Sequence, residues 1–333
     1  MSEKLMYGSS LKGMRTALKE TLLEVARVNE KVIVIDCETG TATNILPFKK
    51  EFPGRFIKLG VAEQNSISFA FGVSTSGYIP IVPLFGCFMT RRACDQIFIQ
   101  VGYAEANIKL IGCYSGLTSP NTGATHQTVN DVSIMRSIPG IVVIEASNES
   151  ELREAIIMAV KIHGPVYIRM IRGDINPYDS MEVKLEGEFE IGKARILREG
   201  CDVTLIGSGL MVKRCLEAAE LLSKEGISAE VINCSTIKPL DENTILKSAS
   251  KTKAVVTAEN HSIIGGLGSA VAEFISEYCP IPVKRVGIMD KYGESAKLED
   301  LFMKYGLTNQ AVMAAVKQVL LTKKTHKDEN IRN

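Results

Sequence analysis

Apolar and polar residues follow two alternating periods along the first half of the chain. Short β-branched runs such as Lys31–Cys37 lack polar alternation and predict strands that are buried on both faces. Longer stretches such as Gly13–Val28 carry apolar residues on one helical face and predict amphipathic helices. The predicted strands are 31–37, 55–58, 79–84, 107–113, 141–145 and 165–170, and the predicted helices are 13–28, 62–76, 89–104, 128–137 and 149–162. This succession indicates a mostly parallel sheet with helices on both faces.

A second α/β unit follows a stretch that has no periodicity. Residues 173–188 contain Asn176-Pro177 and an acidic run, which are typical of a linker. After them we predict strands 203–207, 228–234, 253–258 and 282–287 and helices 210–225, 242–249, 266–277, 297–304 and 309–322. The polar end of the chain from Lys323 is expected to fray. The fold class is therefore α/β, with two domains that each contain a mostly parallel sheet flanked by helices.

Composition supports this architecture and narrows the function. At 333 residues the chain is long for a single core, so two domains are expected. Its net charge of +1, with 45% hydrophobic and 23% charged residues, gives no sign of a nucleic-acid surface or of disorder. Eight cysteines without a CxxC pattern predict buried, reduced thiols in the cytoplasm. We find neither a signal-peptide pattern nor an apolar run of membrane-spanning length, so no membrane contact is expected.

The first candidate for chemistry is Glu63, at the turn from strand 55–58 into helix 62–76. A carboxylate in the first helical turn faces free backbone N–H groups and the positive end of the helix dipole. The apolar residues behind it, such as Ile67 and Phe71, place it at the edge of a dry core, where a carboxyl group is costly. Glu63 is either a functional carboxylate or a residue that satisfies its own helix N-terminus.

Three further clusters follow predicted strands, and each has a structural alternative. Phe85 and Phe88 form an aromatic pair that can stack on a flat heterocycle or fill the core. His126 ends a turn-rich loop, where it can bind a substrate oxygen, move a proton or be solvated. Arg172 follows a strand and can hold a phosphate or form a surface ion pair. Since ligands bind at the carboxyl ends of parallel strands, we expect these residues at one edge of the sheet.

The glycine-rich run 265–268 precedes a predicted helix and superficially resembles a phosphate loop. It lacks both the lysine of a P-loop and the spacing of a dinucleotide site. We interpret it as tight helix packing, with His261 as a structural partner.

Together these stretches resemble the C-terminal half of transketolases. The matching segments, in order along about residues 10–322, are LGVAEQN at 59–65, F-x-x-F at 85–88, GATHQTVNDVSIMRSIPG at 123–140, GPVYIRMIRG at 164–173, STIKPLD at 235–241 and ENHSIIGGLG at 259–268. The resemblance implies a pyrimidine-binding domain at 8–175, a linker at 176–189, a transketolase C-terminal domain at 190–322 and a polar tail at 323–333.

The same resemblance implies a ketol transfer, in which a two-carbon unit passes from a ketose phosphate to an aldose through thiamine diphosphate. Glu63 would bond the aminopyrimidine ring of the cofactor and favour its reactive imino tautomer. Phe85 would stack on that ring, with Phe88 beside it. His126 would contact substrate oxygens near the reacting carbon, and Arg172 and Arg15 would hold the sugar phosphate.

Three positions depart from the family pattern and affect the substrate more than the chemistry. Thr122 follows Asn121 where many transketolases have an acidic residue that contacts a sugar hydroxyl, and Tyr114 stands where a histidine is common. Arg91 occupies a place where an aromatic residue can follow the Phe pair. We expect Tyr114, Thr122 and Arg91 to contact a non-standard substrate, such as a branched or modified sugar phosphate.

The diphosphate site of the family is not visible in this sequence. In the family a Gly-Asp-Gly motif and a downstream Asn hold the diphosphate through Mg²⁺, and no Gly-Asp-Gly occurs here. The resemblance therefore implies a separate N-terminal transketolase subunit that carries the diphosphate and Mg²⁺ site. Two copies of each subunit would form a heterotetramer, with self-association through the pyrimidine-binding domain.

Other members of the wider group offer alternatives. 1-Deoxy-D-xylulose-5-phosphate synthase has similar A-E-Q, T-H-Q and R-G stretches but normally keeps all its domains on one chain. The beta subunit of a 2-oxo-acid dehydrogenase is a separate chain with the same two domains and would act on pyruvate. An inactive regulatory paralogue is disfavoured because Glu63, Phe85 and His126 are all present.

Overall fold

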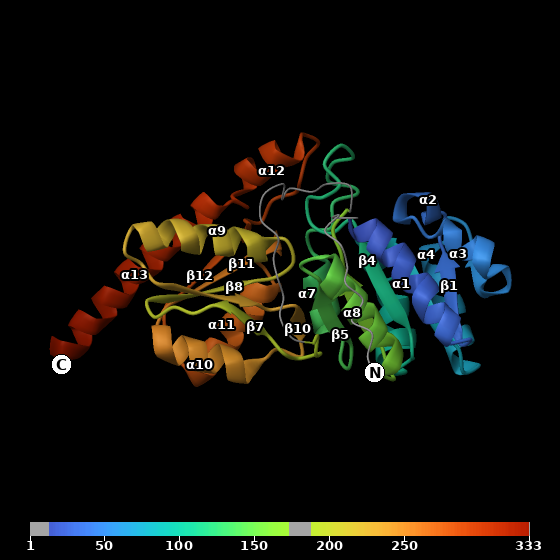
Figure 1. The fold of residues 1–333 in the computed structure, drawn as a ribbon, viewed down its shortest axis with the longest axis horizontal. Coiled ribbons are helices and arrows are strands. Elements are labelled where there is room, and N and C mark those ends of the chain that lie inside the picture. The colour runs from blue at the N-terminus through green and yellow to red at the C-terminus, as the bar shows by residue number, and fades with distance from the viewer. Residues whose placement is uncertain (1–12, 173–187, 333) are drawn as a thin grey trace, which may run out of the picture.

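The computed structural model describes residues 13–172 and 188–332, which form two α/β domains that lie side by side (Figure 1). The two-domain α/β fold predicted from the sequence is confirmed. Residues 8–12 of the predicted first domain and most of the predicted linker lie outside the described residues.

The first domain is built on a seven-stranded sheet in the order β10-β5-β6-β4-β3-β1-β2. Its strands are β1 (Val32–Asp36), β2 (Phe56–Lys58), β3 (Ile79–Phe85), β4 (Lys109–Cys113), β5 (Val142–Glu145), β6 (Val166–Arg169) and β10 (Thr236–Lys238). All neighbouring pairs are parallel except β10 with β5. The central strands are buried along their whole length, as their apolar runs predicted. The sheet therefore brings the carboxyl ends of six strands to one edge.

Helices cover both faces of this sheet. One face carries α1 (Met14–Val28) and α8 (Glu149–Lys161), and the other carries α4 (Glu63–Thr75), α5 (Gly86–Arg92) and α7 (Asp131–Ser137). The predicted helix 89–104 is instead three pieces, because α5 ends at Arg92 and is followed by α6 (Cys94–Gln96) and a π-helix, η2 (Ile97–Tyr103). The short elements α2 (Gly40–Thr43), α3 (Leu46–Glu51) and η1 (Pro53–Arg55) were not predicted.

The second domain has a five-stranded sheet in the order β12-β11-β8-β9-β7. Its strands are β7 (Arg195–Arg198), β8 (Val203–Gly207), β9 (Ala229–Asn233), β11 (Val255–Ser262) and β12 (Val283–Ile288), and only the unpredicted edge strand β7 is antiparallel. Helices α9 (Met211–Lys224) and α13 (Asn309–Arg332) pack on one face, and α10 (Glu242–Thr252) and α11 (Leu267–Tyr278) on the other, while α12 (Leu298–Tyr305) precedes α13 (Figure 1).

Two expectations about the second half of the chain are corrected. The polar end does not fray after Lys323, because α13 continues to Arg332. The sequence from 323 to 332 contains neither Gly nor Pro, so nothing in it stops a helix that is already formed. In addition β10, which lies within the range assigned to the second domain, pairs with β5 and completes the sheet of the first.

Candidate functional site

The carboxyl ends of three neighbouring strands bring the predicted residues together. Phe85 ends β3, Tyr114 follows β4, and Arg172 lies just beyond β6; in the sheet these strands are adjacent in the order β3-β4-β6. Glu63 begins α4, shortly after the edge strand β2. The strand-end rule predicted correctly that Phe85 and Arg172 lie at one edge of the sheet.

Glu63 is buried at the first position of α4 and lines an open pocket of about 410 Å³. The pocket is bounded by Val61, Ala62, Glu63, Gln64, Asn65 and Arg92. Arg92 Nη1 donates a hydrogen bond of 2.6 Å to Glu63 Oε1. The carboxylate side chain is 8% exposed, whereas the arginine side chain is 51% exposed. The pair therefore joins a fixed buried acid to a cation that can move into solvent.

Arg92 also links Glu63 to the aromatic residues. Its guanidinium lies over the Phe88 ring at 4.2 Å from the centroid, within the range of a cation–π contact. Sequence reasoning missed Arg92. Its spacing from Phe88 could have indicated it. Residues at positions i and i+4 of a helix lie on one face, and Phe88 and Arg92 stand in this relation on α5.

The aromatic side chains form a continuous row. The Phe85 and Phe88 rings are nearly parallel, with centroids 5.6 Å apart, and Phe85 stacks on Tyr114 at 4.1 Å. The His126 ring meets Phe88 edge-on at 5.0 Å and Phe85 at 6.2 Å. Both phenylalanines are partly exposed, so the pair is not simply core packing. An aromatic row that ends in an imidazole can bind a flat ring and place a proton donor or acceptor beside it.

Two arginines flank Tyr114 and make a cationic corner. Arg15 Nη1 and the Tyr114 hydroxyl both donate to the carbonyl oxygen of Ala42, at 3.0 and 2.9 Å. The Arg172 guanidinium lies 5.6 Å from the Tyr114 ring centroid. Burial raises the pKa of Tyr114, against the opposing effect of the two arginines, so its hydroxyl stays protonated. Arg172 Nε is buried without a hydrogen-bond partner among the described residues, and a buried donor of this kind suits an anionic ligand.

The other two substrate candidates lie around the loop that carries His126. Arg91 Nη2 donates to the carbonyl oxygen of Thr125 at 2.9 Å, and Thr125 Oγ1 is 2.8 Å from His126 Nδ1. Thr122 is exposed, and its hydroxyl donates to Ser119. Arg91 is therefore joined to His126 through one residue, whereas the described hydrogen bonds of Thr122 stay within its own turn.

The glycine-rich run is a packing feature, as predicted. Glu259 accepts the backbone N–H groups of Leu267 and Gly268 at 2.7 and 2.8 Å, at the start of α11. A Cβ atom at Gly266 would lie 1.9 Å from Glu259 Oε2, so a larger residue would displace the Glu259 carboxylate from these two N–H groups. His261 is fully buried, its Nδ1 lies 2.7 Å from the carbonyl oxygen of Ser262, and burial lowers its pKa to about 4.

The described residues contain neither a metal-binding cluster nor a membrane-spanning helix. Within residues 13–172 and 188–332, no group of three or more His, Cys, Asp or Glu side chains is placed to hold a metal ion. All eight cysteines are free, and five of them are buried. In the part of the chain that the structure describes, no helix is both long enough and apolar enough to cross a membrane.

The fold and the site define an α/β protein that offers a buried carboxylate, an aromatic row with an imidazole and a cationic corner at one sheet edge. Family models match the chain over residues 12–177 as the transketolase pyrimidine-binding domain and over residues 192–312 as the transketolase C-terminal domain. The chain belongs to the transketolase family. This family depends on thiamine diphosphate.

Similar proteins narrow the placement within the family. The chain is 44% identical to the 6-deoxy-6-sulfo-D-fructose transketolase subunit SqwH of Clostridium sp. (strain MSTE9), over 92% of this chain and 94% of that one. It is 31% identical to an apulose-4-phosphate transketolase subunit of Phocaeicola vulgatus, over 90% and 94%. A solved split-gene transketolase, described as an inactive beta4 tetramer, superposes with a TM-score of 0.84 at 39% identity and covers 93% of this chain and 99% of its own. The chain thus corresponds to a transferase subunit of the split type.

Proposed function

We propose that this chain forms a ketol-transferring enzyme with an N-terminal transketolase subunit and that thiamine diphosphate binds between the two. The observation that carries this proposal is the buried Glu63 carboxylate, which opens on a pocket beside an aromatic row and a histidine. The similarity to SqwH over 94% of that subunit favours a split transketolase over a 1-deoxy-D-xylulose-5-phosphate synthase. The cysteines of this chain are free and mostly buried, which supports a location in the cytoplasm.

The residues around Glu63 fit the pyrimidine end of the cofactor. A buried carboxylate at the wall of a pocket can accept a proton from a ring nitrogen or share one with it. Phe85 and Phe88 would hold the ring, and the half-exposed Arg92 can leave the Glu63 carboxylate to the cofactor. When bound, thiamine diphosphate supplies the carbon nucleophile that carries the two-carbon unit. We assign the diphosphate and Mg²⁺ to the N-terminal subunit, so Glu63 faces that partner.

The substrate would lie along the row from His126 to the cationic corner. His126 would donate to or accept from oxygens near the reacting carbon, because its ring lies edge-on against Phe88, which would hold the cofactor ring. Arg172, with its unpartnered Nε, and Arg15 would bind a terminal anion on either side of Tyr114. Arg91 and Thr122 would contact the sugar from the loop. The names of the two relatives specify 6-deoxy-6-sulfo-D-fructose and apulose 4-phosphate. We therefore favour a modified ketose with a terminal phosphate or sulfonate.

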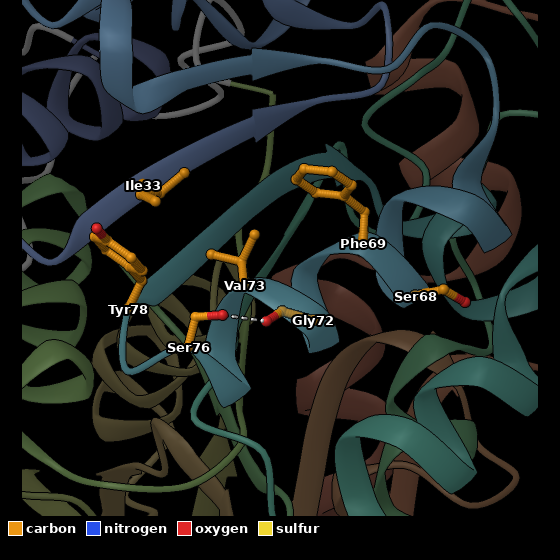
Figure 2. A pocket seen from close by; sticks show the side chains of 7 residues that line it. All are labelled: Ile33, Ser68, Phe69, Gly72, Val73, Ser76 and Tyr78. Carbon is orange, nitrogen blue, oxygen red and sulfur yellow. Dashed lines mark hydrogen bonds between the residues drawn. The ribbon is translucent and has the colours of Figure 1, made fainter.

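The first domain offers an apolar surface for self-association. A groove of about 460 Å³ runs along α4, lined by Ile33, Ser68, Phe69, Gly72, Val73, Ser76 and Tyr78 (Figure 2). Phe69 and Tyr78 are about 40% exposed, and Phe98, Ile99 and Tyr103 on the adjacent η2 are also exposed. We assign this face, called the α4–η2 face below, to a second copy of the chain. Two copies of each subunit would then make a heterotetramer.

The test is a reconstitution of the proposed enzyme. The chain is purified alone and together with the product of a neighbouring transketolase-like gene, each with thiamine diphosphate and Mg²⁺. Transfer of a two-carbon unit is assayed with three ketoses as donors, namely fructose 6-phosphate, 6-deoxy-6-sulfo-D-fructose and apulose 4-phosphate, and with the 2-oxo acid pyruvate. Transfer from a ketose in the mixture alone supports the proposal. Activity of the chain alone contradicts the split enzyme, and activity restricted to pyruvate indicates one of the alternative enzymes.

Glu63→Ala tests the central residue. We expect the reconstituted turnover to fall by about 10²–10⁴-fold, the usual contribution of a proton-transferring group, while the complex still assembles. Glu242→Ala is the matched control, because Glu242 also lies in the first turn of a helix but on α10 of the second domain. Turnover in the Glu63 variant equal to that of the control would remove Glu63 from the mechanism.

A further inference from the structure

The loop from Tyr114 to Thr128, between β4 and α7, is held in place from the second domain. This loop carries His126, Thr122 and the residues around them. Its neck is closed by two bridges, from Ser115 and Gly116 to Thr128. Groups of the second domain form hydrogen bonds with the loop both at its neck and at its tip. Figure 1 shows this part of the first domain next to the segment that leads into α12.

Asn260, on β11, fits into the neck of the loop. It is fully buried; its Oδ1 accepts the N–H of Leu117 at 3.2 Å, and its Nδ2 donates to the carbonyl oxygen of Ser115 at 3.4 Å. Between them Gly116 adopts a positive φ of 57°, and a Cβ there would lie 2.1 Å from Asn260 Nδ2. The backbone of the neck and the Asn260 side chain are therefore matched to each other.

Arg169 ties the other side of the neck to the same strand. Its Nη2 donates to the carbonyl oxygens of Thr128 and Asn260, at 3.0 and 2.8 Å. The rest of the guanidinium is paired with Asp131 at 2.8 Å and with Glu145, and all three side chains are buried. Because a buried guanidinium that is bonded through all three of its nitrogens has little freedom to move, it fixes Thr128 relative to Asn260.

A connection of the second domain between β12 and α12 holds the loop tip. Ser295 Oγ donates to the carbonyl oxygen of Asn121 at 2.8 Å, and the N–H of Ala296 donates to the carbonyl oxygen of Pro120 at 3.2 Å. From the loop side, Gln127 Nε2 donates to the carbonyl oxygen of Glu294 at 2.9 Å. These contacts lie on both sides of Thr122 and directly beside His126.

We propose that the second domain sets the conformation of this loop and that Asn260 and Ser295 are positioning residues for His126 and Thr122. Neither Asn260 nor Ser295 is among the residues assigned to substrate. Without these contacts, the loop would sample several conformations, and only a fraction would present His126 correctly. The apparent affinity for substrate falls in proportion to that fraction. The kinetic part of this inference rests on the proposed function, whereas the structural part does not.

Amide hydrogen exchange of the full chain tests the structural part. In Asn260→Ala we expect residues 114–128 to exchange about tenfold faster, because a buried donor and acceptor lose their partner. Both sheets should keep their protection. Ser276→Ala is the control, since the Ser276 hydroxyl donates within α11 and is exposed. Unchanged exchange in the loop, or an equal acceleration in both domains, would overturn the proposal.

Kinetics of the reconstituted enzyme test the catalytic part. With the best ketose donor we expect Asn260→Ala to raise KM about tenfold while kcat changes less than about threefold, in line with a reduced competent fraction. Ser295→Ala, an exposed site that cannot endanger the fold, should raise KM in the same direction by about threefold. An unchanged KM in both variants contradicts the positioning role. If the wild-type mixture shows no ketol transfer, the proposed function fails, and the exchange result alone decides this inference.

Discussion

Arg92 and Glu63 show how single side chains connect groups that are far apart in the sequence. Glu63 is buried, and one bond to Arg92 links it to the Phe88 ring. A partly exposed ion pair of this kind contributes little to stability. Its importance is positional, because the carboxylate is held at the pocket wall while the arginine stays free to move into solvent.

His261 makes a contribution to stability that depends on pH. Burial lowers its pKa to about 4, although the neighbouring Asp131 acts in the opposite direction. The unfolded chain, with a histidine pKa of about 6.5, therefore binds more protons between pH 6.5 and 4. Stability from this group is lost as the pH falls through that window, by about 2 kcal/mol at pH 5. Glu259, whose pKa burial raises to about 7, acts in the opposite sense, because its folded form holds a proton that the unfolded form releases.

His261→Gln isolates the histidine contribution. The Glu259 contribution is common to both proteins, so we compare the free energy of unfolding of variant and wild type by urea titration at each pH. The wild type loses the histidine contribution as the pH falls and the variant does not. We therefore expect the free energy of unfolding of the wild type to fall by about 2 kcal/mol relative to that of the variant from pH 7 to pH 5. A gap that stays constant with pH would mean that His261 titrates alike in the folded and unfolded chain.

At the scale of elements, β10 is the clearest case of a strand that serves another domain. It pairs with β5 at the edge of the first sheet, and Lys238 at its end donates to the carbonyl oxygens of Arg136 and Ile138, at and just beyond the end of α7. Burial lowers the pKa of Lys238, and the charge of Arg136 adds to this. The lysine thus caps a helix from a different part of the chain.

Lys238→Met removes this cap and keeps the length of the side chain. We expect the free energy of unfolding to fall by about 1 kcal/mol, since the two carbonyl oxygens lose a charged donor. Lys247→Met, at an exposed position on α10, is the control and should leave stability unchanged within about 0.5 kcal/mol. Equal unfolding midpoints for the two variants would show that the cap does not contribute.

The same elements show what the sequence could and could not predict. The strand and helix periods predicted both mostly parallel sheets, and the strand-end rule placed Phe85 and Arg172 at one edge. Local periodicity could not reveal β7 or β10, because each is short and is defined by a partner strand elsewhere in the chain. Nor could it reveal the bonds of Asn260 to a loop that lies 143 residues away.

At the scale of the whole molecule, the proposed self-association through the α4–η2 face can be tested by a charge. Phe69→Glu places a charge in the apolar groove, and burying that charge against a second copy would be costly. We expect the molar mass of the purified chain, measured by light scattering, to fall to that of a monomer while the circular dichroism is unchanged.

A matched control uses the other domain. Met303 on α12 is 73% exposed, so Met303→Glu adds the same charge at another exposed apolar position, outside the α4–η2 face. This variant should keep the molar mass of the wild type. If both variants keep that mass, self-association does not use the α4–η2 face.

Because the chain is synthesised from its N-terminus, β10 is made long after the other strands of its sheet. The ribosome releases the first six strands of the seven-stranded sheet before residues 236–238 are made. During that interval β5 is a bare sheet edge, which is a hazard for association between nascent chains. The hydrogen bond from Arg169 to the carbonyl oxygen of Asn260 likewise cannot form until residue 260 has been made. The limits of the two family domains are therefore not limits of folding, and the first domain becomes complete only after residues up to Asn260 in the second have been translated.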